Sequence, residues 1–133
     1  MIDFALLELG PKPNQYLVCP AEFCPKAHAH RAAPTYDVPA QKLREAFLKV
    51  AGEQKRTTVV EQDEAAFKVE LVQRSAIMRF PDTITVQFIA ISDAQSSLAI
   101  YSRSQYGYSD LGVNKKRIDS WLELLEAELS AQK

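Results

Sequence analysis

Ile84-Thr85-Val86-Gln87-Phe88 alternates apolar with polar side chains, and Leu98-Ala99-Ile100-Tyr101-Ser102-Arg103 follows the same period of two. Successive side chains of a β-strand point to opposite faces of its sheet, so the alternation predicts two neighbouring strands joined by the polar stretch 92–97. Upstream, the β-branched run 57–61 and the alternating run 67–71 flank a polar turn at 62–64, which predicts a hairpin. Short connections favour an antiparallel meander of all four strands.

Two amphipathic helices flank these strands. Pro39 stands at a first helical position, and apolar residues then recur at helical spacing until Gly52, which predicts a helix over about 40–51. Apolar residues from Ile118 to Leu129 form a second stripe, which predicts a helix from near Asn114 to about Ser130. The order α-β-β-β-β-α predicts an α+β fold, a two-layer sandwich in which a four-stranded antiparallel sheet carries both helices on one face.

Residues 10–38 form a proline-rich N-terminal arm ahead of an α+β body at 39–131. Six of the seven prolines fall between residues 11 and 39, where they remove backbone donors and restrain the preceding residues. Tyr16, Leu17 and Val18 are among the apolar residues with which the arm can pack, so we expect an ordered but irregular strap. The whole chain, 1–133, is expected to form a single domain.

The composition excludes some classes of function. Of 133 residues, 47% are hydrophobic and 25% charged, the ordinary balance of a globular domain. Sixteen Lys and Arg against seventeen Asp and Glu give a net charge of −1, so we expect no nucleic-acid partner. No apolar run approaches the ~20 residues of a membrane span, and no basic and apolar signal-peptide regions open the chain.

The densest polar cluster lies between the fourth strand and the last helix, at 103–117. Asn114 suits a helix N-cap, yet cations follow in the first turn, where the helix dipole disfavours them. One explanation is a bound anion; the other, which we rank first, is internal pairing with acids such as Asp82 or Asp110. The candidate ligand-binding residues are Arg103, Ser104, Gly107, Asp110, Gly112, Asn114, Lys115 and Arg117.

The segment between the second and third strands carries a second polar group, formed by Arg74, Arg79 and Asp82. We interpret it as a structural network in which an Arg79–Asp82 ion pair holds one turn, with Arg103 able to join. Signatures of a nucleophile elbow, a dinucleotide loop or a zincin helix do not occur, and the Gly107-to-Gly112 spacing lacks the lysine of a phosphate loop. The catalytic residues therefore stay undefined, and no cofactor is expected.

Cys19, Cys24, His28 and His30 lie within twelve residues of the arm. Thiolate and imidazole are good zinc or copper ligands, but the spacing is not that of a standard zinc finger. Two cysteines five residues apart can also close a small disulfide loop. We rank a Cys19–Cys24 disulfide first, free thiols second and a metal site third.

Several of these segments together resemble a known family. Arg74-Ser75, Arg79-Phe80-Pro81-Asp82, Tyr101-Ser102-Arg103-Ser104 and the run Gly107 to Asn114 with Arg117 resemble the uncharacterised bacterial domain-of-unknown-function family 1499, over about residues 13–129. The resemblance implies a stand-alone cell-envelope domain, since members of that family often follow a signal or membrane anchor. This chain shows no such segment, so it is either a cytoplasmic member or one whose anchor is missing; a disulfide would favour the second.

Two hypotheses of function follow. In the first, a non-catalytic cell-envelope domain, periplasmic or membrane-anchored, binds an anionic small molecule or a partner protein through the 103–117 loop and the helix N-terminus. In the second, a small hydrolase-like enzyme uses Asp82 or Asp110 as a base and Arg103 as an electrostatic stabiliser. We favour the first, because no nucleophile and base can be paired from the sequence.

Overall fold

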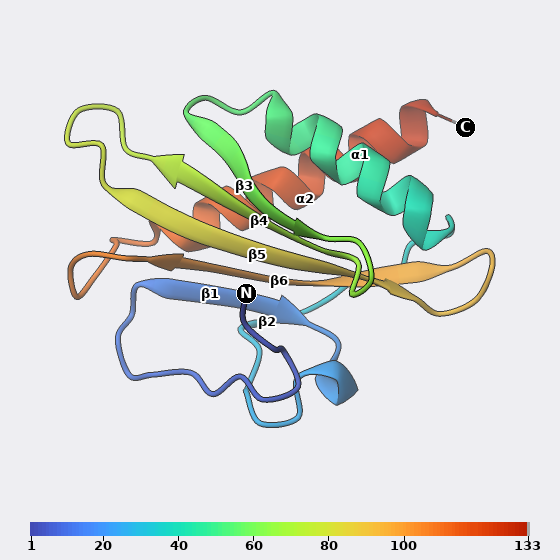
Figure 1. Cartoon of the computed structure of the whole chain (residues 1–133), viewed down its shortest axis with the longest axis horizontal. Helices are drawn as coiled ribbons and strands as arrows, with labels where there is room; N and C mark the ends of the chain where they lie inside the picture. The colour runs from blue at the N-terminus through green and yellow to red at the C-terminus, as the bar shows by residue number, and fades with distance from the viewer. Residues whose placement is uncertain (133) are drawn as a thin grey trace.

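A computed structural model describes residues 1–132 and contains one six-stranded sheet and two long helices (Figure 1). The strands are β1 (Gln15–Cys19), β2 (Arg31–Ala32), β3 (Thr57–Asp63), β4 (Lys68–Arg74), β5 (Pro81–Ala90) and β6 (Ser96–Ser104). The helices are α1 (Ala40–Gly52) and α2 (Val113–Ala131), and a short 3-10 turn, η1, spans Ala21–Phe23. None of the helices within residues 1–132 has the length and apolarity needed to cross a bilayer.

The expected four-stranded antiparallel sheet is wrong, although the fold is of the α+β class. The strand order is β2-β1-β6-β5-β4-β3, and β1 pairs with β2 in parallel while the other neighbours are antiparallel. The two additional strands, β1 and β2, come from the arm at 10–38, for which the sequence predicts irregular structure. Residues 16–19 are buried on both faces of the sheet, and a strand buried on both faces shows no alternation of apolar and polar residues.

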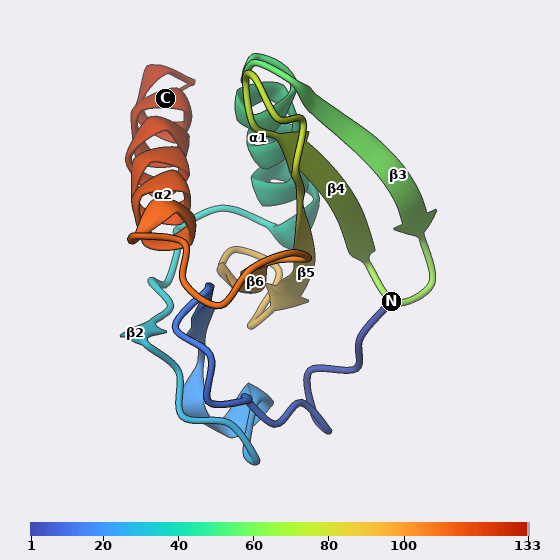
Figure 2. The same cartoon turned by 90° about the vertical axis from the view of Figure 1, so that its left-hand side faces the viewer.

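Both helices cover one face of the sheet, as expected (Figure 2). Phe47 of α1 lies edge-on to Phe88 of β5 and to Trp121 of α2, so aromatic rings fill the space between the layers. On β6, Leu98 and Ile100 join this core. The meander β3 to β6 and the helices therefore follow the sequence pattern closely.

The arm and the first nine residues cover the other face of the sheet. Ala99 and Tyr101 of β6 point to this side and pack in a smaller apolar cluster with Phe4 and Leu17. Lys68 of β4 donates a hydrogen bond to the carbonyl of Ile2 at 2.8 Å, which ties the N-terminus to the sheet. The protein therefore has three layers: helices, sheet and an irregular N-terminal cover.

Candidate functional site

A row of polar side chains crosses the helix-facing side of the sheet next to the N-terminus of α2. Gln73 on β4 lies opposite Asp82 on β5, which lies opposite Ser104 on β6. Because side chains alternate along a strand, these residues share a face with core residues such as Ile84. The apolar core thus gives way to hydrogen-bonding groups at this end of the sheet.

Arg117 of α2 lies on this polar row. Its Nη2 atom is 2.8 Å from Asp82 Oδ2, and the two side chains are only 8% and 13% exposed. Its Nη1 atom donates to Ser102 Oγ at 3.1 Å, and its Nε donates to Gln73. Asp82 thus pairs with Arg117 in place of the Arg79–Asp82 ion pair expected from the sequence.

Asn114 is fully buried at the centre of this network. Its Oδ1 accepts hydrogen bonds from Ser102 and Arg117 at 2.5 and 2.8 Å. Its Nδ2 has two N–H groups and three acceptors within reach, Ser104 Oγ, Asp110 Oδ2 and the carbonyl of Asn14 in the arm, so one N–H is shared. Asn114 therefore joins α2, β6 and the arm, and a structural role accounts for every polar atom of its side chain.

Asp110, and not Asn114, caps the N-terminus of α2. Its carboxylate accepts the backbone N–H of Gly112 at 2.8 Å and that of Asn114 at 3.0 Å, and Gly112 adopts the left-handed φ of 82° at the N-cap position. Burial acts to raise the pKa of Asp110, but the hydrogen bonds from Asn114 and Gly112 outweigh it and hold the pKa below its usual value. The negative partner of the helix dipole is thus supplied by the chain itself.

The other predicted ligand-binding residues divide between several places. Lys115 donates to Asp119 at 2.7 Å and lies over the ring of Tyr16. The carbonyl of Gly107, at a φ of 85°, accepts a hydrogen bond from the side chain of Asn14. Each of these residues is held by a contact within the protein.

Arg103 lies on the opposite face of the sheet from Arg117. It donates to Thr85 Oγ1 at 2.8 Å, lies 3.6 Å from Glu70 Oε1 and covers the ring of Tyr101. Burial lowers the pKa of its guanidinium, with the charge of Glu70 opposing the shift. The hydrolase-like hypothesis requires Arg103 beside Asp82 or Asp110. The structure places Arg103 on the other face of the sheet, away from both carboxylates.

A pocket of about 350 Å³ opens beside the polar row. It is lined by Arg56, Gln73, Arg74, Ser75, Phe80, Asp82, Ser104, Tyr106, Ser109, Asp110, Val113 and Arg117. The guanidinium of Arg56 donates to the carbonyl of Arg74 at 2.9 Å, and that of Arg74 to the carbonyl of Arg79 at 3.0 Å. Within residues 1–132, neither Arg56 nor Arg74 has an acidic partner.

The sequence indicated part of this pocket. Arg74, Asp82, Ser104, Asp110 and Arg117 were singled out, although as members of two separate groups. Arg56 was missed, because it lies in the connection after α1 and no motif marks it. Its contact with Arg74 comes from the pairing of β3 with β4, which a residue pattern alone does not align.

The family comparison agrees with these segments. A family described as "Protein of unknown function (DUF1499)" matches residues 8–125, which is most of the chain. The chain belongs to the DUF1499 family. No curated protein matches it.

Two solved structures are similar to this DUF1499 domain. A di-domain ARO/CYC protein, BexL, from the BE-7585A biosynthetic pathway is 14% identical, with a TM-score of 0.55. The match covers 74% of this chain and 45% of that chain, so this chain spans about half of BexL. Ara h 8.0201 is 11% identical with a TM-score of 0.46, over 74% of this chain and 94% of that chain. At such identities the likeness to BexL shows the fold alone.

In the DUF1499 domain the two cysteines of the arm, Cys19 and Cys24, form a disulfide. His30, weighed as a metal ligand, accepts the backbone N–H of Leu17 on Nδ1 at 2.9 Å and stacks on Tyr16. In the part of the chain that the structure describes, no group of three or more His, Cys, Asp or Glu side chains is arranged to hold a metal ion. His28 lies in the same segment.

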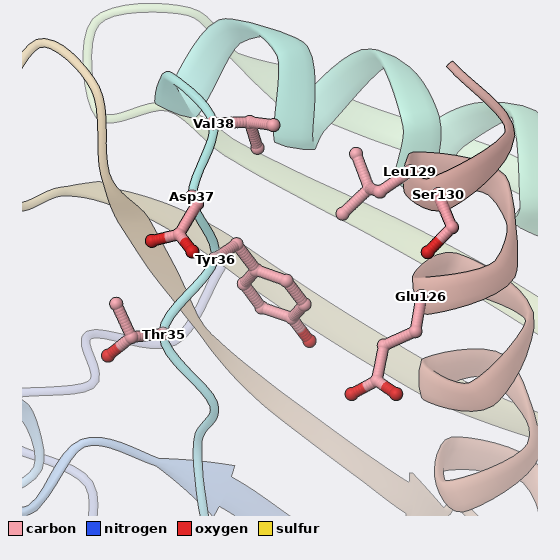
Figure 3. Close-up of a pocket in the computed structure, with 7 residues that line it drawn as sticks. All are labelled: Thr35, Tyr36, Asp37, Val38, Glu126, Leu129 and Ser130. Atoms are coloured by element: carbon pink, nitrogen blue, oxygen red, sulfur yellow. The ribbon is translucent and has the colours of Figure 1, made fainter. Parts of the chain in front are cut away.

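A second pocket, of about 260 Å³, lies between the arm and the C-terminal half of α2 (Figure 3). The hydroxyl of Tyr36 points toward the carboxylate of Glu126, and it is buried without a hydrogen-bond partner within residues 1–132. Burial, and then the charge of Glu126, raise the pKa of Tyr36 far above its usual value. Asp37 and Glu126 line this pocket without a cation, so it does not suit an anion.

Proposed function

We propose that this protein is a non-catalytic domain of the cell envelope that binds an anionic small molecule in the pocket lined by Arg56, Arg74 and Arg117. The observation that carries the proposal is an imbalance of charge. Three arginines reach one pocket, whereas its two carboxylates, Asp82 and Asp110, are already engaged by Arg117 and by the start of α2. The charges of Arg56 and Arg74 remain available to a ligand.

The chemistry of the lining favours a phosphate or a carboxylate. A guanidinium presents several N–H donors in a plane and binds such groups in pairs of hydrogen bonds. Ser75 and Ser109 add hydroxyl groups, while Phe80 and Val113 add apolar surface for the remainder of a ligand. A small organic phosphate or carboxylate matches this combination.

A binding function fits the carboxylates better than a catalytic one. A general base must have a free lone pair within reach of a substrate proton. One oxygen of Asp82 accepts from Arg117, and both oxygens of Asp110 accept hydrogen bonds from Gly112 and Asn114. The hydrogen bonds to Asp110 hold its pKa low, which makes it a weak base.

Titration of the protein with inorganic phosphate and with glycerol phosphate, followed by calorimetry, tests the proposal. Loss of one charged contact of this kind weakens binding about tenfold, so Arg74→Gln is expected to raise Kd about tenfold while Arg74→Lys retains part of the affinity. Lys42→Gln, an exposed change near the start of α1 and outside the pocket, is the control and leaves Kd unchanged. No binding of either phosphate, or equal Kd values for wild type and Arg74→Gln, would contradict the proposal.

The location in the cell envelope is supported by the Cys19–Cys24 disulfide, since disulfides persist in oxidising compartments and are rare in the cytosol. Alkylation of intact cells with a thiol reagent, before lysis and mass measurement, tests it. We expect both cysteines to resist alkylation until a reductant is added. Complete alkylation without reductant would place the protein in a reducing compartment.

A further inference from the structure

Six large apolar side chains project from two loops at one end of the molecule. They are Ile77, Met78 and Phe80 in the β4–β5 loop and Tyr106, Tyr108 and Leu111 in the β6–α2 loop, and we call them the apolar tip. Ile77 is 89% exposed and Leu111 is 90% exposed, and each of the others is more than half exposed. Single exposed apolar residues are ordinary on protein surfaces, but a contiguous group marks an interaction site.

The two loops form one surface. Both lie at the same end of the molecule, where β4 and β6 end (Figure 1), and the rings of Phe80 and Tyr106 contact each other with centroids 5.9 Å apart. Residues far apart in the sequence therefore build the apolar tip together.

The exposure is fixed by the loop backbones. The β4–β5 loop is closed by the N–H of Ser75 donating to the carbonyl of Phe80, and by the N–H of Phe80 donating to Ser75 Oγ, both at 3.0 Å. In the other loop Leu111 has a left-handed φ of 54°, a conformation that disfavours side chains with a Cβ. The structure thus holds Leu111 away from the core in spite of its backbone strain, which calls for a role outside the fold.

Cations surround the apolar tip. Arg74 and Arg79 belong to the same loop region, Arg56 lies next to Arg74, and Lys116 is exposed at the start of α2. The acids of this end, Asp82 and Asp110, are engaged within the protein.

The opposite end of the molecule carries the reverse charge. The β3–β4 turn has Asp63, the β5–β6 turn has Asp93, and the C-terminal half of α2 has Glu123 and Glu126, none of which forms an ion pair within residues 1–132. Glu64 and Glu128, also at this end, pair with Arg44 and Lys49. The net charge of −1 therefore conceals a separation of the unpaired charges along the molecule. The end with exposed apolar groups is the positive one.

We propose that this end docks on a lipid bilayer that contains anionic headgroups. Ile77, Met78 and Leu111 enter the interfacial region, the two tyrosines lie at the level of the headgroups, and the arginines and Lys116 contact the anionic lipids. The projecting loops suit the deformable surface of a bilayer, and the basic surround complements its negative charge. The proposal shares Arg56 and Arg74 with the anion pocket, but none of the three aliphatic residues lines that pocket, so substitutions at them test the docking alone.

Sedimentation of the full chain with vesicles tests the docking. Vesicles of phosphatidylglycerol mixed with phosphatidylcholine are expected to bind the protein, while phosphatidylcholine alone binds it at least tenfold more weakly. Raising the salt from about 0.1 M to about 1 M shortens the screening length from about 10 Å to about 3 Å. Because this weakens the attraction between the cations and the anionic lipids, we expect the high salt to release the protein from the vesicles. Equal binding to both kinds of vesicle, or none to either, would overturn the proposal.

Variants locate the contact. The double change Ile77→Ser with Leu111→Ser is expected to weaken binding to the mixed vesicles at least tenfold, and Arg79→Glu about fivefold. Ile91→Ser, a half-exposed isoleucine at the opposite end, and Lys42→Glu are the matched controls and leave binding unchanged. Equal losses in the control variants would contradict the assignment to the apolar tip.

Two further measurements separate the alternatives. Light scattering of the free protein identifies a second copy as the occupant: a dimer that Ile77→Ser with Leu111→Ser dissociates, without vesicle binding, would overturn docking to a bilayer. Calorimetry with inorganic phosphate separates this proposal from the anion pocket, because the same double variant is expected to bind phosphate like the wild type. Either proposal can therefore fail while the other stands.

Discussion

The two faces of the sheet are covered in different ways. On one face α1 and α2 bury a large core that includes Phe47, Phe88 and Trp121. On the other face an irregular chain with a two-residue strand and a 3-10 turn covers a smaller cluster around Phe4 and Leu17. A helix satisfies its own backbone and contributes apolar side chains along a whole stripe, whereas an irregular cover needs individual bonds to hold its backbone in place.

The arm obtains such bonds from the disulfide and from polar contacts. Cys19 is joined to Cys24, Arg31 and Tyr16 both donate to Asp119 of α2, and the carbonyl of Asn14 accepts from Asn114. The comparison teaches that a disulfide and polar contacts with α2 replace part of the apolar burial in holding the arm. Five variants test this difference.

The largest effect is expected in the helix-covered core. Phe47→Ala removes a fully buried ring that contacts two other aromatic residues, and should lower the free energy of unfolding by about 4 kcal/mol. Urea unfolding followed by the fluorescence of Trp121, the single tryptophan, measures it.

Phe4→Ala is the matched change on the arm face, where Phe4 is only 1% exposed. We expect about half the loss, because residues 1–9 can detach without unfolding the sheet. Equal losses of unfolding free energy for Phe47→Ala and Phe4→Ala would show that the helices and residues 1–9 unfold as one cooperative unit. The two faces would then not differ in how firmly they are covered.

The next effect concerns Asn114, whose hydrogen bonds join the arm to β6 and α2. Asn114→Ala removes the hydrogen bonds that its side chain makes to buried groups on β6, α2 and the arm, and should cost about 3 kcal/mol. Ser120→Ala, an exposed change on the same helix, is the control for helix propensity. A loss below about 0.5 kcal/mol would mean that water replaces these bonds and that the joint is not structural.

Removal of the disulfide should have a smaller effect, confined to the arm. The double change Cys19→Ala and Cys24→Ala opens a loop of only a few residues and is expected to cost about 2 kcal/mol. Hydrogen exchange should rise in β1 and β2 while α1 and α2 remain protected. Reduction of the wild type gives an independent measure, and faster exchange in the helices would argue against a separately held arm.

The smallest effect is expected from Asp119, which joins α2 to the arm. Burial acts to raise its pKa, but hydrogen bonds from Lys115, Tyr16 and Arg31 outweigh it and hold the pKa below its usual value of 3.8. A carboxyl whose folded pKa is depressed stabilises the fold fully above its unfolded pKa, and the contribution is lost as the pH falls through the folded pKa.

Because the side chain of Asp119 is partly exposed, its ionised form contributes about 1 kcal/mol or less to the free energy of unfolding at pH 7. Asp119→Asn should remove this contribution, so the urea midpoint of the variant is expected to lie below that of the wild type at pH 7. Below the usual pKa of Asp119, the two midpoints should approach each other. A constant difference between the two proteins from pH 7 to pH 3 would show that ionisation of Asp119 does not matter.

The helix-covered face was predictable because its residues repeat with regular periods. Both helices and the meander β3 to β6 follow from spacings of three to four and of two residues. The arm was not predictable in the same way, because Tyr16 to Cys19 are all buried and so show no period. The surrounding prolines hid a strand that pairs with β6 along four register positions.

The site was predictable only in part. The alternation in β6 already separates Arg103 from Ser102 and Ser104, and that signal, read strictly, would have removed Arg103 from the group around Arg117. The pairing of Arg117 with Asp82 and the contact of Asn14 with Gly107 join residues from distant parts of the chain. Such contacts depend on the strand order, which the sequence pattern did not define.

The pairing of the first strand with the last has a consequence for how the chain acquires its structure during synthesis. β1 is synthesised long before β6, the strand that covers its antiparallel edge, so the apolar run from Tyr16 to Cys19 stays without that partner until most of the chain has been made. Contacts between residues so distant in the sequence slow folding. Until they form, apolar segments stay exposed and can aggregate with other chains. Cys19 and Cys24 are only five residues apart, so in an oxidising compartment their bond can form without waiting for β6.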